Sequence, residues 1–272
     1  MFPKFAQGLR KKITIKKPDE IENWHEFQTW YRSALGQRLL ESENDLFEKF
    51  LPDLFGYFLL QCGCPEIIAN NAAGKWLTSS RVSSRICLDY QKNHGISCQA
   101  RLVQLPIQSD SIDIVVLPHV LEFSADPHQV LREVERVLIT EGHVIILGFN
   151  PWSLWNLRRR LMFWTKNPPW NAQFLAATRV MDWLALLGFE VIQRQGYFYR
   201  PPISKENVIE QLSILEKLGQ RFWPNFGAGY ALVARKRVQT LTPIRPRWRS
   251  NPRSRSQIIA NGLETMTGKK CE

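Results

Sequence analysis

The chain has 272 residues, a length that suits one large α/β domain with additions and leaves little room for two complete domains. Hydrophobic residues make up 44% of it, which indicates a globular core, and no apolar run approaches the roughly 20 residues of a membrane span. Five cysteines argue against a disulfide framework, and the N-terminus lacks the apolar region of a signal peptide, so a cytoplasmic protein is expected.

The net charge of +11 is concentrated near the two ends of the chain. Residues 1–17 contain six Lys or Arg and no acid, and residues 235–256 contain eight and no acid. Subtracting these 14 charges from +11 leaves −3 for the rest, so the central part is mildly acidic. Residues 239–272 are rich in Pro, Ser and Arg and are expected to be a disordered tail, either solvated or in weak contact with nucleic acid or anionic lipid.

In chain order, apolar periodicity predicts two helices at 19–35 and 43–54, before any strand. A first strand at 55–60, a helix at 65–77, and strands at 84–89 and 97–103 follow. These alternating elements indicate a parallel sheet covered by helices.

The clearest stretch of the sequence lies between residues 105 and 150. Residues 112–117 form a β-branched strand buried on both faces, and Asp126 and Pro127 can begin a helix as N-cap and first residue. Gly142 permits a sharp stop before a second buried strand at 143–149. Two buried strands joined by a helix predict a right-handed βαβ unit.

After Pro151 the sequence predicts a Trp- and Arg-rich insertion in which Trp155 and Arg159 share a helical face. That helix is either a half-buried cover or a lid that stacks on a planar or anionic substrate. A helix at 174–187, a strand at 189–193, a helix at 204–218 and a strand at 230–234 complete the chain. Asn167-Pro168-Pro169-Trp170 is interpreted as a turn within the insertion.

Two motifs in this sequence resemble those of a known family. L-P-I-Q-S-D-S-I-D-I-V-V at 105–116 and E-G-H-V-I-I-L-G at 141–148 are similar to the second half of class I AdoMet-dependent methyltransferases of type 11. The resemblance is usable over 55–237, and N-P-W-S-L-W-N-L-R-R-R at 150–160 looks like an uncharacterised bacterial branch. It implies a Rossmann-like, seven-stranded α/β sheet with the last strand antiparallel, N-terminal helices that cover the site, and a disordered basic C-terminal tail. The implied boundaries are 1–54, 55–238 and 239–272.

The resemblance also implies a cofactor loop after the first strand, formed by Gln61, Cys62 and Gly63. The family has an acid and several glycines there, whereas Gln61 replaces the acid and Pro65 stands where a second glycine would be. A single glycine also fits an ordinary strand-to-helix turn. Cys62 and Cys64 are not interpreted as metal ligands, because no second Cys/His pair stands at zinc spacing, so no metal site is expected.

Other site residues follow from the same alignment. Asp89 corresponds to the acid that holds the ribose of S-adenosyl-L-methionine, with a solvated loop Asp as the alternative. Leu102 would recognise adenine through its backbone, because the neighbouring Arg101 offers no acceptor. Leu117 and His119 would line the reacting end. His119 is either a general base or a helix-start residue packed on the cofactor edge, and Glu122 is the other titratable side chain of this loop.

The sequence therefore predicts an enzyme that transfers a methyl group from AdoMet to an acceptor that the sequence does not name. The alternative is a degenerate methyltransferase fold that acts as a binding or scaffold module, associated with nucleic acid. Gln61, Pro65, Arg101 and the basic tail favour that alternative. A nicotinamide dehydrogenase is disfavoured because the G-x-G-x-x-G pattern is absent.

Overall fold

The computed structural model describes residues 20–63, 81–90, 96–161, 169–202, 223 and 225–237. The predicted helices at 65–77 and 204–218 and the tail at 239–272 lie outside these ranges. Within them, no helix is both long and apolar enough to cross a membrane.

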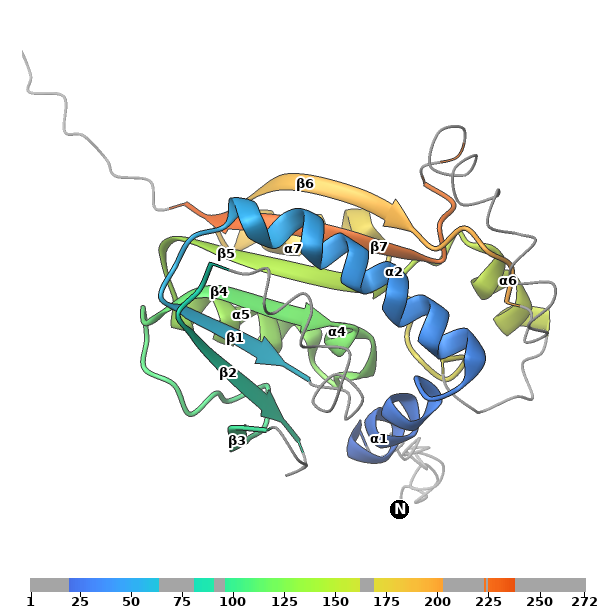
Figure 1. The fold of residues 1–272 in the computed structure, drawn as a ribbon, viewed down its shortest axis with the longest axis horizontal. Coiled ribbons are helices and arrows are strands. Elements are labelled where there is room, and N and C mark those ends of the chain that lie inside the picture. The colour runs from blue at the N-terminus through green and yellow to red at the C-terminus, as the bar shows by residue number, and fades with distance from the viewer. Residues whose placement is uncertain are drawn as a thin grey trace, which may run out of the picture. The chain divides into compact units, whose positions relative to one another are not determined.

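The described residues form a seven-stranded sheet in the order β3-β2-β1-β4-β5-β7-β6 (Figure 1). β7 runs antiparallel to both of its neighbours, β5 and β6, while the other pairs are parallel. This confirms the predicted fold class, including the antiparallel last strand. The strand bounds are β1 Phe58–Cys62, β2 Ser84–Asp89, β3 Cys98–Gln99, β4 Ile112–Pro118, β5 Leu138–Phe149, β6 Phe189–Tyr197 and β7 Gly229–Lys236.

Helices lie on both faces of the sheet. In Figure 1, α2 crosses the near face, whereas α5 and α7 lie behind. Each of these three helices buries an apolar stripe. The helix bounds are α1 Glu20–Trp30, α2 Ala34–Phe50, the short 3₁₀ helix Leu51–Asp53, α4 Val120–Phe123, α5 Pro127–Val137, α6 Leu154–Leu161 and α7 Ala177–Leu186.

The N-terminal helices differ from the prediction. The first helix, α1, ends at Trp30, and α2 begins at Ala34, well before the predicted start at 43. The cause is a cap: Ser33 is extended, and its hydroxyl accepts a hydrogen bond from the Gly36 amide at 3.1 Å. A Cβ on Gly36 would lie 2.5 Å from the Trp30 carbonyl oxygen, so this close turn requires glycine.

Smaller differences concern strand ends. β1 begins at Phe58 rather than at 55. The Asp113 carboxylate accepts hydrogen bonds from the amides of Tyr57 and Phe58 at 3.0 and 2.9 Å, which fixes the residues directly before the strand. In the turn before the buried part of β5, Glu141 has the positive φ, 65°, rather than Gly142. Gly142 is required for space instead, since a Cβ would lie 2.9 Å from the Ile139 carbonyl oxygen.

Candidate functional site

The predicted site residues gather at one edge of the sheet. β1, β2 and β4 are parallel, so Gly63, Asp89 and His119, which follow or end these strands, lie at the same edge. Figure 1 shows α1 at the arrowhead end of β1 and β2. This is where open α/β sheets bind ligands.

Asp89 is fully buried, although the sequence allowed a solvated loop residue. Its Oδ1 accepts a hydrogen bond from the Trp24 indole N–H at 2.8 Å, and its Oδ2 accepts from the Gln28 amide N–H at 2.6 Å. The Tyr90 amide also donates to Oδ1 at 2.6 Å. The carboxylate therefore has one neutral side-chain donor from α1 on each of its oxygens.

Gly63 supports the second half of the same arrangement. Its φ is +75°, a conformation that favours glycine, and a Cβ there would lie 2.7 Å from the Trp24 ring. The Gly63 amide donates to the Leu88 carbonyl oxygen at 2.8 Å, which ties the end of β1 to β2. Trp24 thus packs on the glycine turn while it holds Asp89.

The remaining predicted cofactor residues are buried around this turn. Gln61 and Cys62 end β1, Leu117 lies in β4, and Leu102 lies in the loop that follows β3. The Gln61 amide reaches the Gly63 carbonyl oxygen at 3.5 Å. Burial, with smaller contributions from Asp89 and Cys87, raises the pKa of the Cys62 thiol, so Cys62 is an uncharged core residue.

His119 occupies a second buried polar cluster. Its Nε2 lies 3.0 Å from Glu43 Oε1, and its Nδ1 lies 3.2 Å from Glu122 Oε1. Two tyrosine hydroxyls, those of Tyr31 and Tyr197, donate to Glu43 at 3.1–3.4 Å. We call these five residues the His119 cluster. Each is at most 4% exposed.

The two carboxylates determine the charge of the imidazole. Burial by itself lowers the pKa of His119, but the charges and hydrogen bonds of Glu122 and Glu43 outweigh it and raise the pKa to about 9. His119 therefore holds its proton at neutral pH in this conformation. Its φ of 54° places it at a left-handed turn directly before α4. A role as general base stays a prediction, and it requires that this proton first be given up.

Glu122 links the cluster to the end of β5. Its Oε1 accepts from the Phe149 amide at 2.6 Å, in addition to the contact with His119. Among the described atoms, its Oε2 is buried and has no hydrogen-bond partner. An unsatisfied buried carboxylate oxygen is costly, so Glu122 Oε2 calls for an explanation, and a functional role is one.

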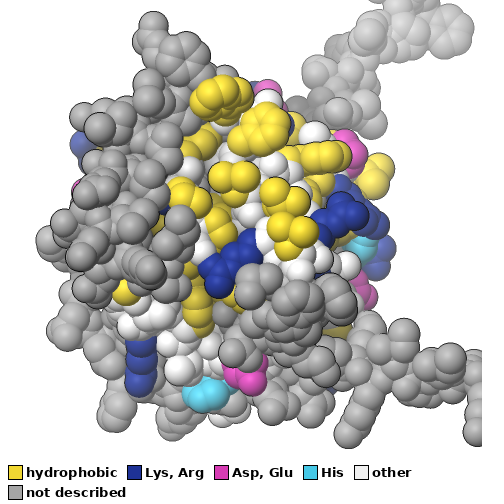
Figure 2. Space-filling model, turned by 90° about the vertical axis from the view of Figure 1, so that its right-hand side faces the viewer, with side chains coloured by type: hydrophobic (Ala, Val, Ile, Leu, Met, Phe, Trp, Pro, Cys, Tyr) yellow, Lys and Arg dark blue, Asp and Glu magenta, His cyan; other side chains and the backbone are white. Residues whose placement is uncertain are grey.

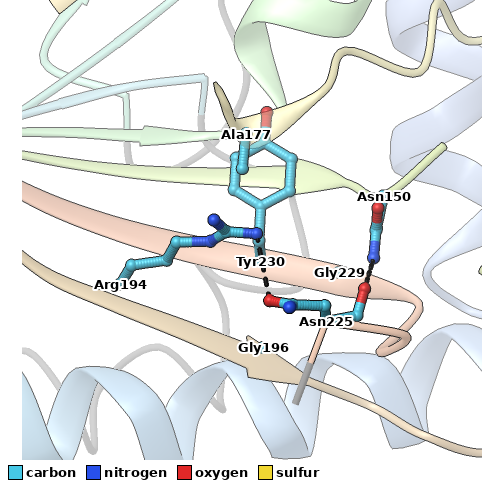
Figure 3. A pocket seen from close by; sticks show the side chains of 7 residues that line it. All are labelled: Asn150, Ala177, Arg194, Gly196, Asn225, Gly229 and Tyr230. Carbon is cyan, nitrogen blue, oxygen red and sulfur yellow. Dashed lines mark hydrogen bonds between the residues drawn. The ribbon is translucent and has the colours of Figure 1, made fainter. Parts of the chain in front are cut away.

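A small polar pocket lies farther along the same edge (Figure 3). It is formed where β5 ends, β6 ends and β7 begins. The Arg194 guanidinium donates to Asn225 Oδ1 at 3.2 Å, and the Asn150 amide donates to the Asn225 carbonyl oxygen at 2.6 Å. The lining residues are Asn150, Ala177, Arg194, Gly196, Asn225, Gly229 and Tyr230. None of them was predicted from the sequence.

Sequence reasoning missed the α1 and α2 side chains of the site. Trp24 and Gln28 stand four residues apart on one face of α1, and Glu43 lies within the apolar stripe of α2. An acid in an otherwise apolar stripe was a usable signal for a buried partner. No local sequence pattern predicts that α1 packs over Gly63.

The predicted absence of a metal concerned Cys62 and Cys64, of which only Cys62 lies in the described part of the chain. There, no cluster of three or more His, Cys, Asp or Glu could hold a metal ion. Cys62, Cys87 and Cys98 do not form disulfide bonds. In the insertion, Trp155 is fully buried and Arg159 half-buried, as the cover-helix interpretation expected.

Three comparisons extend these observations. Residues 75–146 match the family model described as a methyltransferase domain. The uncharacterized protein YafS of Escherichia coli K12 is 33% identical over 232 residues, which cover 85% of this chain and 86% of YafS.

Two solved structures share the fold. A Thermotoga maritima SAM-dependent methyltransferase, a possible histamine N-methyltransferase, has a TM-score of 0.53 and 16% identity, with 79% of this chain and 99% of that one covered. A putative methyltransferase of Haloferax volcanii, solved with the Trm112 activator, has a TM-score of 0.54 and 14% identity, with 78% and 98% covered. With a methyltransferase domain matched at 75–146 and the seven-stranded sheet of these enzymes, the chain belongs to the class I SAM-dependent methyltransferase family, and YafS is a relative of it.

Proposed function

We propose that this protein binds AdoMet at the ends of β1 and β2 and transfers its methyl group to an acceptor. The observation that carries the proposal is the pairing of Asp89 with two neutral donors, from Trp24 and Gln28. A ribose presents two neighbouring hydroxyl donors and can take their place on the same two oxygens. The residues therefore fit the cofactor, provided that α1 moves.

Gly63 supports the same assignment. Trp24 packs against its Cα side at a place where any Cβ would collide, so the turn already accommodates a flat group at close range. We propose that Gly63 and Asp89 hold the cofactor, while Leu102 and Leu117 contribute apolar walls. AdoMet supplies an already activated methyl group on a sulfonium, so the protein has mainly to align an acceptor and exclude water.

Glu122 is the better candidate for a proton acceptor in this site. His119 stays protonated at neutral pH, whereas Glu122 Oε2 is a buried acceptor atom without a partner among the described residues. The imidazolium would hold Glu122 in position through Oε1 while Oε2 receives a donor from the methyl acceptor. His119 is then a positioning residue.

A second function is favoured by the same α1 contact. If Trp24 never leaves Gly63, the protein is a methyltransferase fold without catalysis, as the departures at Gln61 and Arg101 also suggest. The two functions differ in whether α1 can be displaced by ligand.

Calorimetric titration of the full chain with AdoMet and S-adenosylhomocysteine tests the proposal. We expect Asp89→Ala to weaken binding about 10- to 100-fold, the loss of hydrogen bonds to a charged group. Trp24→Ala should tighten binding, because the closed state no longer competes with the ligand. Trp183→Ala on α7 is the control and should change nothing. If neither the wild type nor Trp24→Ala binds AdoMet, the second function is correct.

A further inference from the structure

The outer face of α6 is apolar although it lies at the surface. The helix buries Trp155 completely, yet three leucines on its opposite side, Leu154, Leu157 and Leu161, are 55%, 52% and 65% exposed. Residues spaced by three, four and seven positions share one helical face. The helix thus presents a continuous leucine stripe to its surroundings.

Aromatic side chains extend this stripe. Trp152 is 74% exposed, Trp223 61% and Phe226 58%. Asn150 connects them, because its side chain accepts from the Trp152 amide at 3.0 Å and donates to the carbonyl oxygens of Asn225 and Gly227. We call the six residues the α6 face: Trp152, Leu154, Leu157, Leu161, Trp223 and Phe226. Figure 2 shows hydrophobic side chains gathered on this side of the molecule, with Lys or Arg side chains at their margin.

The stretch of sequence that contains α6 carries charge of one sign. The sequence has no acidic residue between Glu141 and Asp182, whereas it has four Arg and one Lys there. Arg160 is exposed beside the leucine stripe, and Arg158 is held by the Pro202 carbonyl oxygen and the Trp170 ring at its border. Tryptophans, leucines and arginines in this arrangement are typical of helices that lie in the interface of an anionic membrane.

We propose that the α6 face docks on an anionic lipid surface, with the leucines and tryptophans in the headgroup region and the arginines on lipid phosphates. A second copy of the chain fits less well, because it would bring Arg158 and Arg160 against their own copies. A nucleic acid would use the arginines and tryptophans but leave the three leucines in water. The two basic ends of the sequence would add long-range electrostatic attraction to an anionic membrane.

The test is co-sedimentation of the full chain with vesicles of phosphatidylcholine containing 30 mol% phosphatidylglycerol, compared with pure phosphatidylcholine. We expect binding to the anionic vesicles only, weakened by salt. Leu157→Glu should lower the partition coefficient about tenfold or more, because a charge replaces a leucine that would enter the headgroup region of the membrane. Leu186→Glu is the matched control, since Leu186 on α7 is 85% exposed and should not contribute.

Two further variants separate the α6 face from the basic ends. Leu161→Ser should reduce binding without affecting melting, and it guards against a folding defect in Leu157→Glu. Arg160→Gln should reduce binding more than Arg132→Gln, an exposed arginine on α5. The proposal is overturned if the wild type does not bind anionic vesicles, or if Leu157→Glu binds as the wild type does. It is also overturned if the α6 variants change only self-association or RNA binding.

Discussion

Two buried carboxylate sites lie at the same edge of the sheet, and they are held by different kinds of partner. In the described part of the chain, the donors to Asp89 are the Trp24 indole, the Gln28 amide and the Tyr90 backbone amide, all of them neutral. Glu43 and Glu122 are held by the imidazolium of His119, a charge. Neutral donors can be exchanged for those of a ligand at small cost, whereas an ion pair removed from one partner leaves a buried charge. We therefore expect the contacts of α1 to Asp89 to open first, while the pairs of His119 with Glu43 and Glu122 stay intact.

The largest effect should come from breaking the charged site. Glu43→Gln removes one of the two carboxylates from His119 and disturbs both tyrosine contacts, so the free energy of unfolding should fall by about 3 kcal/mol, the loss of several buried hydrogen bonds. Urea denaturation measures this. Glu41→Gln, on the same helix but 62% exposed and paired only with Arg38, should cost about 1 kcal/mol or less. Equal losses in the two variants would contradict the assignment of a buried ion network.

The pH dependence of stability sharpens the comparison. In the folded state the pKa of His119 is raised to about 9, above its unfolded value near 6.5. Protonated His119 therefore makes its full contribution to the free energy of unfolding below about pH 6.5. That contribution is lost as pH rises through 9 and amounts to about 3 kcal/mol. Chemical denaturation between pH 6 and pH 10 measures it. His119→Asn should remove most of this slope, and Asp89→Asn should leave it in place.

Asp89→Asn tests the neutral site. The amide of Asn would face three N–H donors with only one oxygen, so we expect a loss of about 1–3 kcal/mol in unfolding free energy. The burial of Asp89 excludes the alternative interpretation of this residue as a solvated loop Asp. A variant as stable as the wild type would show that the α1 contacts contribute nothing.

The smallest effect should come from Gln28→Ala. One hydrogen bond to a carboxylate is lost on a helix that also packs through Trp24 and Phe27, so stability should fall by about 1 kcal/mol. Hydrogen exchange in α1 should accelerate while exchange in α2 is unchanged, because opening would be confined to α1. Acceleration in both helices would mean that the two sites open together.

Much of the fold was predictable because its signals are local. β2 matches its predicted range of 84–89, and α5 begins at Pro127, where the Asp126 cap was expected. β4 and β5 were recognisable from consecutive β-branched residues, whose burial on both faces needs no knowledge of distant segments. The break between α1 and α2 was missed, because it depends on one hydroxyl and on the space around Gly36.

The sequence by itself determined the class of sheet, its seven strands with the last one antiparallel through the family resemblance, and the candidate positions Gly63, Asp89 and His119. Only the tertiary structure decided how these positions are held. Trp24 lies 65 residues before Asp89, and Glu43 lies 76 residues before His119, so neither partner could be read from local periodicity. Hydrogen bonds and charge pairing act through space, and burial strengthens them because little water remains to compete.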